Sequence, residues 1–200
     1  LRNNNLLNVR TPGTKHTHTL MSGGVISVPD EEYDTFLRLY AEEVRMGNSN
    51  LTLSELRSDP LFRMYFDVDL LDENVLTEDF YMRMSGIIQD VIKTYYPHGT
   101  EEDVFKCVIC TTPTKNVEKK GVNFIKNGYH IIYPNLNVNL EQAFQLRYNI
   151  VYKLEEVLGA RKIDSNTWSD AIDRAPYNNG LKMCGSFKMV KCTACKNKNI

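Results

Sequence analysis

The sequence lacks a long apolar run. None of its 200 residues fall in a stretch approaching the roughly 20 consecutive apolar residues that a membrane-spanning helix needs. Residues 1–10 also lack the apolar segment of a secretory signal peptide. Net charge is small as well: a formal charge of −1 disfavours a protein that coats nucleic acid non-specifically, because such proteins carry a strongly basic face. We therefore expect an intracellular protein with no membrane partner.

Cysteine, proline and glycine are scarce too. Seven prolines and 11 glycines exclude collagen-like and linker compositions, and 42% hydrophobic residues are enough for a packed core. Five cysteines, an odd number, disfavour the disulfide framework of a small secreted domain. Cys107 and Cys110 lie in an apolar run and are interpreted as buried strand residues. Cys192 and Cys195 have the spacing of half a zinc site.

Apolar periodicity and capping signals predict intermixed helices and strands without a regular βαβ repeat, which favours the α+β class. The expected helices are 31–46, 77–95 and 140–158, and the expected strands are 61–71, 104–112, 128–133 and 181–190. We expect a polar N-terminal arm over 1–28, one catalytic core over 29–190, and the start of a linker or further module over 191–200.

The strand over 61–71 places two aspartates on one face. Alternate side chains of a strand share a face, so Asp67 and Asp69 lie opposite the apolar set. Two carboxylates this close repel each other unless a cation lies between them. Mg²⁺ or Mn²⁺ is the simplest partner, because these ions bind carboxylates together with substrate phosphates. Solvated acids on an open sheet face are the alternative interpretation.

Cations and an imidazole follow on two later strands. Lys126, Gly128 and His130 share a face if the extended run begins at Lys126, and the glycine lets a ligand approach the backbone. In the last expected strand, the polar face carries Lys182, Cys184, Ser186 and Lys188, and the other face carries Leu181, Met183, Phe187 and Met189.

Acids in one region and cations in another suit nucleotidyl transfer. Two carboxylate-held metals activate a 3′-hydroxyl and neutralise the leaving pyrophosphate, while lysine and histidine hold the triphosphate. A third acid is needed, and Asp170 or Asp173 supplies it. Two rival functions remain: a D-x-D glycosyltransferase that uses nucleotide sugars, and a non-catalytic module that binds single-stranded DNA through its basic C-terminal end.

Three motifs in this order resemble the archaeo-eukaryotic primase superfamily, in the primase-polymerase and primase-helicase branch of large DNA viruses. The motifs are F-D-V-D at 66–69, K-N-G-Y-H at 126–130, and I-D-R-A-P-Y at 172–177 followed by L-K-M-C-G-S-F-K at 181–188. The resemblance spans roughly residues 60–190. It departs from the family at Gly128, where a small hydroxyl residue is common, and at Lys182, where relatives often carry arginine.

The resemblance implies an α+β fold with a mixed-sheet primase-type core and an RRM-like half. By the resemblance, Asp67, Asp69 and Asp173 bind two Mg²⁺ or Mn²⁺ ions and are catalytic. The nucleotide-binding residues that it implies are Lys126, Gly128, His130, Lys182, Ser186 and Lys188. It also implies a single-stranded DNA template, nucleoside triphosphates, and a helicase domain in the same full-length chain. A zinc-bearing module beginning at Cys192 and Cys195, and replication in a host cytoplasm or nucleus, belong to the same expectation.

Overall fold

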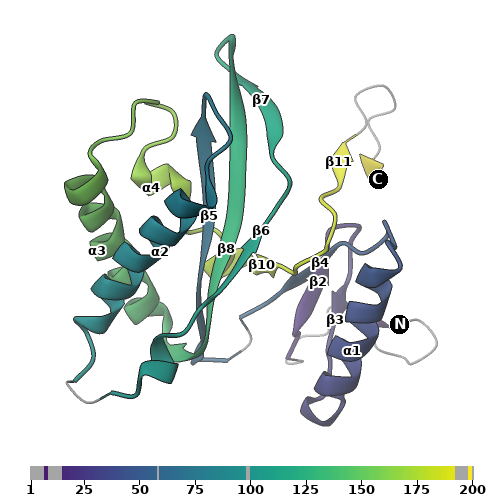
Figure 1. Ribbon diagram of the computed structural model, residues 1–200. Helices are drawn as coiled ribbons and strands as arrows, with labels where there is room; N and C mark the ends of the chain where they lie inside the picture. The colour runs from purple at the N-terminus through teal and green to yellow at the C-terminus, as the bar shows by residue number, and fades with distance from the viewer. Residues whose placement is uncertain (1–6, 9–14, 58, 98–99, 192–197, 200) are drawn as a thin grey trace. The chain divides into compact units, whose positions relative to one another are not determined.

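The computed structural model describes residues 7–8, 15–57, 59–97, 100–191 and 198–199, and it divides the chain into two compact units. The first unit comprises 1–59 and 175–200, and the second comprises 60–174 (Figure 1). The catalytic core expected over 29–190 stays a prediction, and its residues fall in both units. Strands from the N-terminal and C-terminal parts of the chain pair in one sheet, and strands from residues 60–174 form another.

The first unit is a small sheet packed against one helix. Its strands, in the order β1-β3-β2-β4-β10, are Leu7–Asn8, Val25–Ile26, His18–Leu20, Leu53–Glu55 and Leu181–Lys182. Its helices are α1 (Tyr33–Arg45), preceded by a 3₁₀ turn over Asp30–Glu32, and α5 (Pro176–Asn179); β11 (Val190–Lys191) and β12 (Lys198–Asn199) form a separate pair. Part of the segment expected as an arm therefore forms strands, and its buried Ile26 packs with Phe36 of α1.

The second unit has a sheet with helices over one face. Its strands, in the order β6-β8-β5-β9, are Val108–Thr111, Val122–Val138, Phe62–Asp72 and Ile172–Asp173, and β7 (Lys115–Lys119) also pairs with β8. Its helices are α2 (Glu78–Lys93), the 3₁₀ turn Glu102–Phe105, α3 (Leu140–Leu158) and α4 (Trp168–Ala171). All strand pairs among the described residues are antiparallel. Helices combined with antiparallel sheets confirm the α+β class. The sheet that the resemblance leads us to expect as mixed is antiparallel in this structure.

The core of the second unit lies between the sheet and α2 and α3 (Figure 1). One face of β5 is completely buried, and it consists of Met64, Phe66, Val68 and Leu70. The helices cover it with Met84 and Ile88 of α2 and Ile150 of α3. Because side chains alternate along a strand, the intervening residues of β5 lie on the face without helices. The alternation predicted for β5 is confirmed, and it leaves Asp67 and Asp69 on that face.

Two predicted helix features are confirmed by the structure, and one predicted strand is wrong. Thr77 caps α2 by accepting a hydrogen bond from the Phe80 amide, and α3 has the predicted bounds with Gly159 at its end. The strand expected over 181–190 ends at Lys182, because Gly185 turns the chain at φ +80. A Cβ at Gly185 would lie 2.5 Å from a Val44 methyl, so this turn packs directly on α1.

The described part of the chain contains no helix that is both long and apolar enough to cross a bilayer.

His18 makes the stability of the first unit depend on pH. Its side chain is completely buried on β2, its Nδ1 lies 2.9 Å from the Thr17 hydroxyl, and its Nε2 has no hydrogen-bond partner. Burial lowers the pKa of His18 below its usual 6.5, although the Glu55 carboxylate opposes the shift. The unfolded chain therefore binds the proton more readily, and stability falls as pH drops below 6.5.

We expect the free energy of unfolding to fall between pH 7.5 and pH 5.5, by at most about 1.4 kcal/mol per pH unit from this one group. Urea titrations followed by circular dichroism at each pH measure it. His18→Leu should remove this part of the dependence, because leucine carries no proton. Parallel curves for wild type and His18→Leu across this range would show that His18 does not contribute.

Candidate active site

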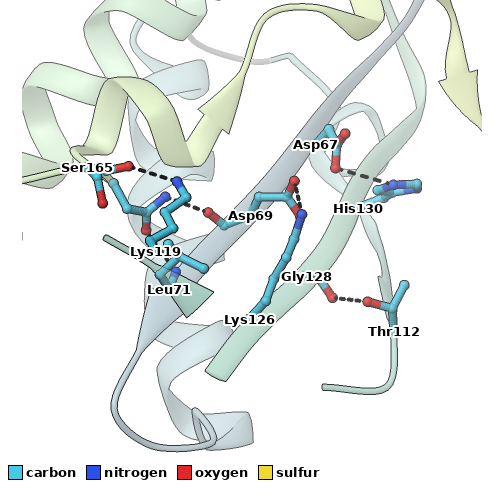
Figure 2. Close-up of polar contacts among 10 residues, drawn as sticks. Asp67, Asp69, Leu71, Thr112, Lys119, Lys126, Gly128, His130 and Ser165 are labelled. Carbon is cyan, nitrogen blue, oxygen red and sulfur yellow. Dashed lines mark hydrogen bonds and ion pairs between the residues drawn. The ribbon is translucent and has the colours of Figure 1, made fainter. Parts of the chain in front are cut away.

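The face of the second sheet that lacks helices carries a row of three predicted site residues. Asp67 of β5 is directly opposite His130 of β8 on one side and directly opposite Asp173 of β9 on the other. Directly opposite residues of antiparallel strands share a face. The His130 Nε2 lies 3.4 Å from the Asp67 carboxylate, and the His130 side chain is only 9% exposed (Figure 2). The structure therefore gathers residues more than 100 positions apart in the sequence.

A second row lies one strand repeat along. Asp69 is opposite Gly128, and Lys126 donates to the Asp69 carboxylate across 2.5 Å (Figure 2). A Cβ on Gly128 would lie 3.2 Å from an Asp69 carboxylate oxygen and 3.1 Å from the Thr112 hydroxyl. Gly128 thus leaves room for the Asp69 side chain, which is a different use from the ligand approach expected at this position.

The structure separates the two candidates for the third acid. Asp170 lies in α4 and accepts hydrogen bonds from the amide and hydroxyl of Thr167, at 2.9 and 2.7 Å. These bonds hold the pKa of Asp170 below its usual value, and they complete a capping box for α4. Asp173 instead lies in β9 opposite Asp67, so the register places Asp173 in the row.

An open cavity adjoins Asp173. Its volume is about 480 Å³, and it is lined by Arg147, Ser169, Asp170, Asp173 and Arg174. Arg147 reaches it from α3 and donates to the Ile172 carbonyl at 2.7 Å and to the Ser169 carbonyl at 2.5 Å. This arginine therefore ties α3 to the segment that carries Asp173.

The three aspartates are of the residue type that binds a divalent cation. Their oxygens are the ligands that Mg²⁺ and Mn²⁺ prefer. Asp67 and Asp173 are like charges directly opposite each other, which destabilises a strand pair unless a cation compensates. Within the described residues, no three His, Cys, Asp or Glu side chains are yet gathered around one point, and Asp69 is turned to Lys126. Lys126 contacts one of the two oxygens of that carboxylate, Oδ2.

Three other predicted residues belong to the first unit. Lys182 lies on β10 and is half-buried, and Lys188 is exposed after the turn at Gly185. Their nucleotide-binding roles stay predictions from the resemblance. Ser186 is buried, accepts a hydrogen bond from the Leu53 amide at 2.9 Å, and lies 2.9 Å from the Tyr40 hydroxyl. Its hydroxyl therefore holds the turn to β4 and α1.

The predictions for the four cysteines in C-x-x-C spacing differ in how they compare with the structure. Cys110 lies on β6 opposite His130, and Cys107 lies just before β6; both are partly exposed rather than buried. Burial nevertheless raises the pKa of the Cys107 thiol, which disfavours its reactive thiolate form. Cys192 and Cys195, and with them the predicted half zinc site, lie outside the described residues.

Sequence reasoning missed two buried asparagines, one of which holds the end of β5 and the other the segment that follows it. The Asn166 side chain accepts from the Leu71 amide at 2.8 Å and donates to the Asp69 carbonyl at 3.0 Å. Asn127, fully buried on β8, accepts from the Leu76 amide at 3.0 Å and donates to the Asn74 carbonyl at 3.2 Å. Asparagine is common in this chain, so composition gave no signal; only the position of Asn127 inside the K-N-G-Y-H motif pointed toward the site.

Comparison with known proteins adds a family. No curated protein matches the chain. A family model described as the C962R protein N-terminal AEP domain matches residues 17–197, a range that includes every predicted site residue. The match includes the second unit, most of the first unit and all three motifs. The chain therefore belongs to the archaeo-eukaryotic primase superfamily, in the family of the C962R N-terminal domain.

Proposed function

We propose that the chain is the catalytic domain of a DNA primase or primase-polymerase, which joins nucleotides to a 3′-hydroxyl on a single-stranded template during DNA replication. Its family supports nucleotidyl transfer of the primase or polymerase type, with a general dependence on divalent metal. The observation that carries the proposal is the row of Asp67, His130 and Asp173 across three adjacent strands. The row puts anionic and basic groups on one face of the sheet.

The acids and the bases of the site have separate roles in this proposal. Asp67, Asp69 and Asp173 would hold the ions, which when bound neutralise charge on the phosphates and lower the pKa of the attacking hydroxyl. Lys126 and His130 would contact the triphosphate of the incoming nucleotide. A rigid sheet positions these groups, and fixed charges aimed at a phosphoryl group stabilise its transition state without reorganisation.

The ion pair of Lys126 and Asp69 suggests that both residues exchange partners when an ion and a nucleotide bind. In the structure each neutralises the other across 2.5 Å, with side chains only 25% and 37% exposed. If Asp69 turns to a cation, Lys126 loses its carboxylate and is left with a partly buried charge. A phosphate oxygen of the nucleotide would replace that carboxylate, so ion and nucleotide binding should favour each other.

The test is metal-dependent synthesis on a template. The chain is given a primed or unprimed single-stranded oligonucleotide, labelled nucleotides, and Mg²⁺ or Mn²⁺. We expect product whose length follows the template, and no product once a chelator removes the metal. Template binding without synthesis under either metal would favour the non-catalytic module, and sugar transfer from a nucleotide sugar without template would favour the glycosyltransferase.

A further inference from the structure

The hairpin of β7 and β8 is the most basic part of an acidic unit. Residues 60–174 contain 13 lysines and arginines and 17 acids. Four of those lysines and one of those acids fall within 115–126, which leaves nine basic residues against sixteen acidic ones elsewhere in the unit. The hairpin residues 115, 116 and 118–123 are all exposed. Positive charge is thus concentrated on one projecting element.

The hairpin leads directly away from the candidate active site. The last pair between β5 and β8 is Asp72 with Ile125, and beyond it β8 pairs with β7 (Figure 1). Lys115 is opposite Lys126, which holds the Asp69 carboxylate. From Lys115 to Lys119 the strand rises about 13 Å, at about 3.3 Å per residue. That span is longer than a triphosphate and suits the repeated phosphates of a polymer.

Apolar side chains lie between the lysines on the same face. Val117 is opposite Phe124, one strand repeat from the pair of Lys115 and Lys126, and both apolar residues are partly exposed. Lysines along a strand with an aromatic ring between them are the arrangement that binds single-stranded nucleic acid: the cations track the backbone and the ring stacks on a base.

The turn of the hairpin contains a lysine in the left-handed backbone conformation, which disfavours residues other than glycine and asparagine. Lys120 and Gly121 form its two-residue loop, with φ +51 and +79, a conformation in which asparagine followed by glycine is the preferred pair. Among the described residues, Lys120 alone has a left-handed φ without being glycine. The neighbouring Lys119 donates to the Ser165 carbonyl at 3.1 Å and so anchors the tip (Figure 2). The loop is therefore held in place with a strained, charged residue at its end.

We infer that the β7–β8 hairpin binds the single-stranded template. Lys115 and Lys120 contact backbone phosphates, and Phe124 stacks on a base. This inference rests on the proposed function, because it names the element that holds the template leading to the site. It assigns the hairpin a ligand class, a single-stranded polynucleotide, rather than the free nucleotide.

The experiment compares the full chain with the double variant Lys115→Gln and Lys120→Asn. Asparagine is chosen at 120 because it tolerates the left-handed conformation. Binding of a fluorescent oligothymidylate is measured by anisotropy between about 50 and 200 mM salt. We expect the slope of log affinity against log salt to lose about 1.4 in magnitude, since each phosphate contact of a single strand contributes about 0.7.

The matched control is Lys106→Gln with Lys153→Gln. It removes the same charge from two lysines, one exposed and one partly exposed, that pair with Asp103 and Glu156, away from the hairpin. We expect its salt slope to stay within error of wild type. If the hairpin variant and this control give equal slopes, the effect is one of net charge and the inference fails.

A third variant, Phe124→Leu, tests stacking. Loss of the ring should weaken oligothymidylate binding about fivefold or more while leaving the salt slope unchanged, because leucine carries the same charge but stacks poorly. Circular dichroism of each variant establishes that the fold is kept. An affinity within twofold of wild type would remove Phe124 from the interface.

These measurements are made without nucleotide or metal, so they stand apart from synthesis. If the chain makes no template-dependent product but the hairpin variant still loses its salt slope, the proposed function fails and the binding surface remains. If synthesis is found and the hairpin variant binds oligothymidylate like wild type, the template lies elsewhere and only the inference about the hairpin is overturned.

Discussion

Asp67→Asn is expected to reduce template-dependent nucleotide incorporation by at least about 10²-fold, the usual effect of removing one group that stabilises a transition-state charge. Asp67 is central in the row, opposite both His130 and Asp173. An amide oxygen keeps the size of the side chain but loses the negative charge that a divalent ion requires. Incorporation is measured with saturating template and with Mg²⁺ or Mn²⁺.

A second readout separates a metal ligand from a residue needed for folding. Without metal, Asp67→Asn should change stability little, because it removes the repulsion between Asp67 and Asp173 together with the negative charge that faces His130. With metal, wild type should gain thermal stability, by about 2.7 kcal/mol at an ion concentration 100 times the Kd, and Asp67→Asn should gain much less. A variant that loses stability without metal and keeps the metal-induced gain would place Asp67 in a structural role.

Asp72→Asn is the matched control. Asp72 ends the same strand, and its carboxylate accepts from the Asn74 amide at 3.2 Å. It lies an odd number of residues from Asp67, so the alternation of the strand places it off the row. We expect its activity within twofold of wild type. Equal losses in both variants would mean that negative charge near β5, rather than Asp67 itself, supports incorporation.

Local signals predicted the parts of the fold that depend on neighbouring residues. The bounds of α3 follow from its apolar period and from Gly159, and the Thr77 cap follows from residue type alone. The two faces of β5 follow from strict alternation. These elements bury one face against the rest of the protein, so their apolar pattern records which side is inside.

The missed parts depend on contacts between distant segments. β8 was expected over 128–133 but spans Val122–Val138, because the polar residues of its first half pair with β7 on an exposed hairpin. The strand expected over 181–190 stops because Gly185 packs against Val44 and Ser186 bonds to Leu53, neither of which is near in sequence. Alternation cannot reveal a partner strand or a turn that packs on a remote helix.

The candidate site shows the same limit. The motifs named Asp67, His130 and Asp173, but only the strand register makes them direct neighbours. The sequence predicts an acidic region and a basic region, but it does not indicate which acidic side chain pairs with which basic one. The ion pair of Lys126 with Asp69 is therefore visible only in the structure. Asn166 was missed altogether, although two of its bonds reach the backbone of β5.

Asn166→Leu is expected to destabilise the second unit by about 3 kcal/mol, because two backbone groups of β5 lose their partners and each costs about 1 to 3 kcal/mol when left unsatisfied. Asn166 is only 4% exposed, and it bonds to the Leu71 amide and the Asp69 carbonyl. β9 pairs with β5 only at Asp67 and Val68, and the Asn166 side chain supplies hydrogen bonds to the β5 backbone just beyond that pairing. Leucine has a similar volume but no polar atoms, so lost hydrogen bonding rather than a cavity would cause the effect.

The single tryptophan makes the measurement specific to this unit. Trp168 is buried close by in sequence, and its indole donates to the Gly159 carbonyl at 2.9 Å, so its fluorescence in urea reports unfolding here. Asn135→Leu is the control, since Asn135 is exposed and donates one bond, to the Asp103 carbonyl at 3.1 Å. We expect the control to change stability by less than about 0.5 kcal/mol, as surface substitutions usually do. Equal midpoints for the two variants would show that Asn166 does not hold β5, and Asp69 would then need another support for its position in the site.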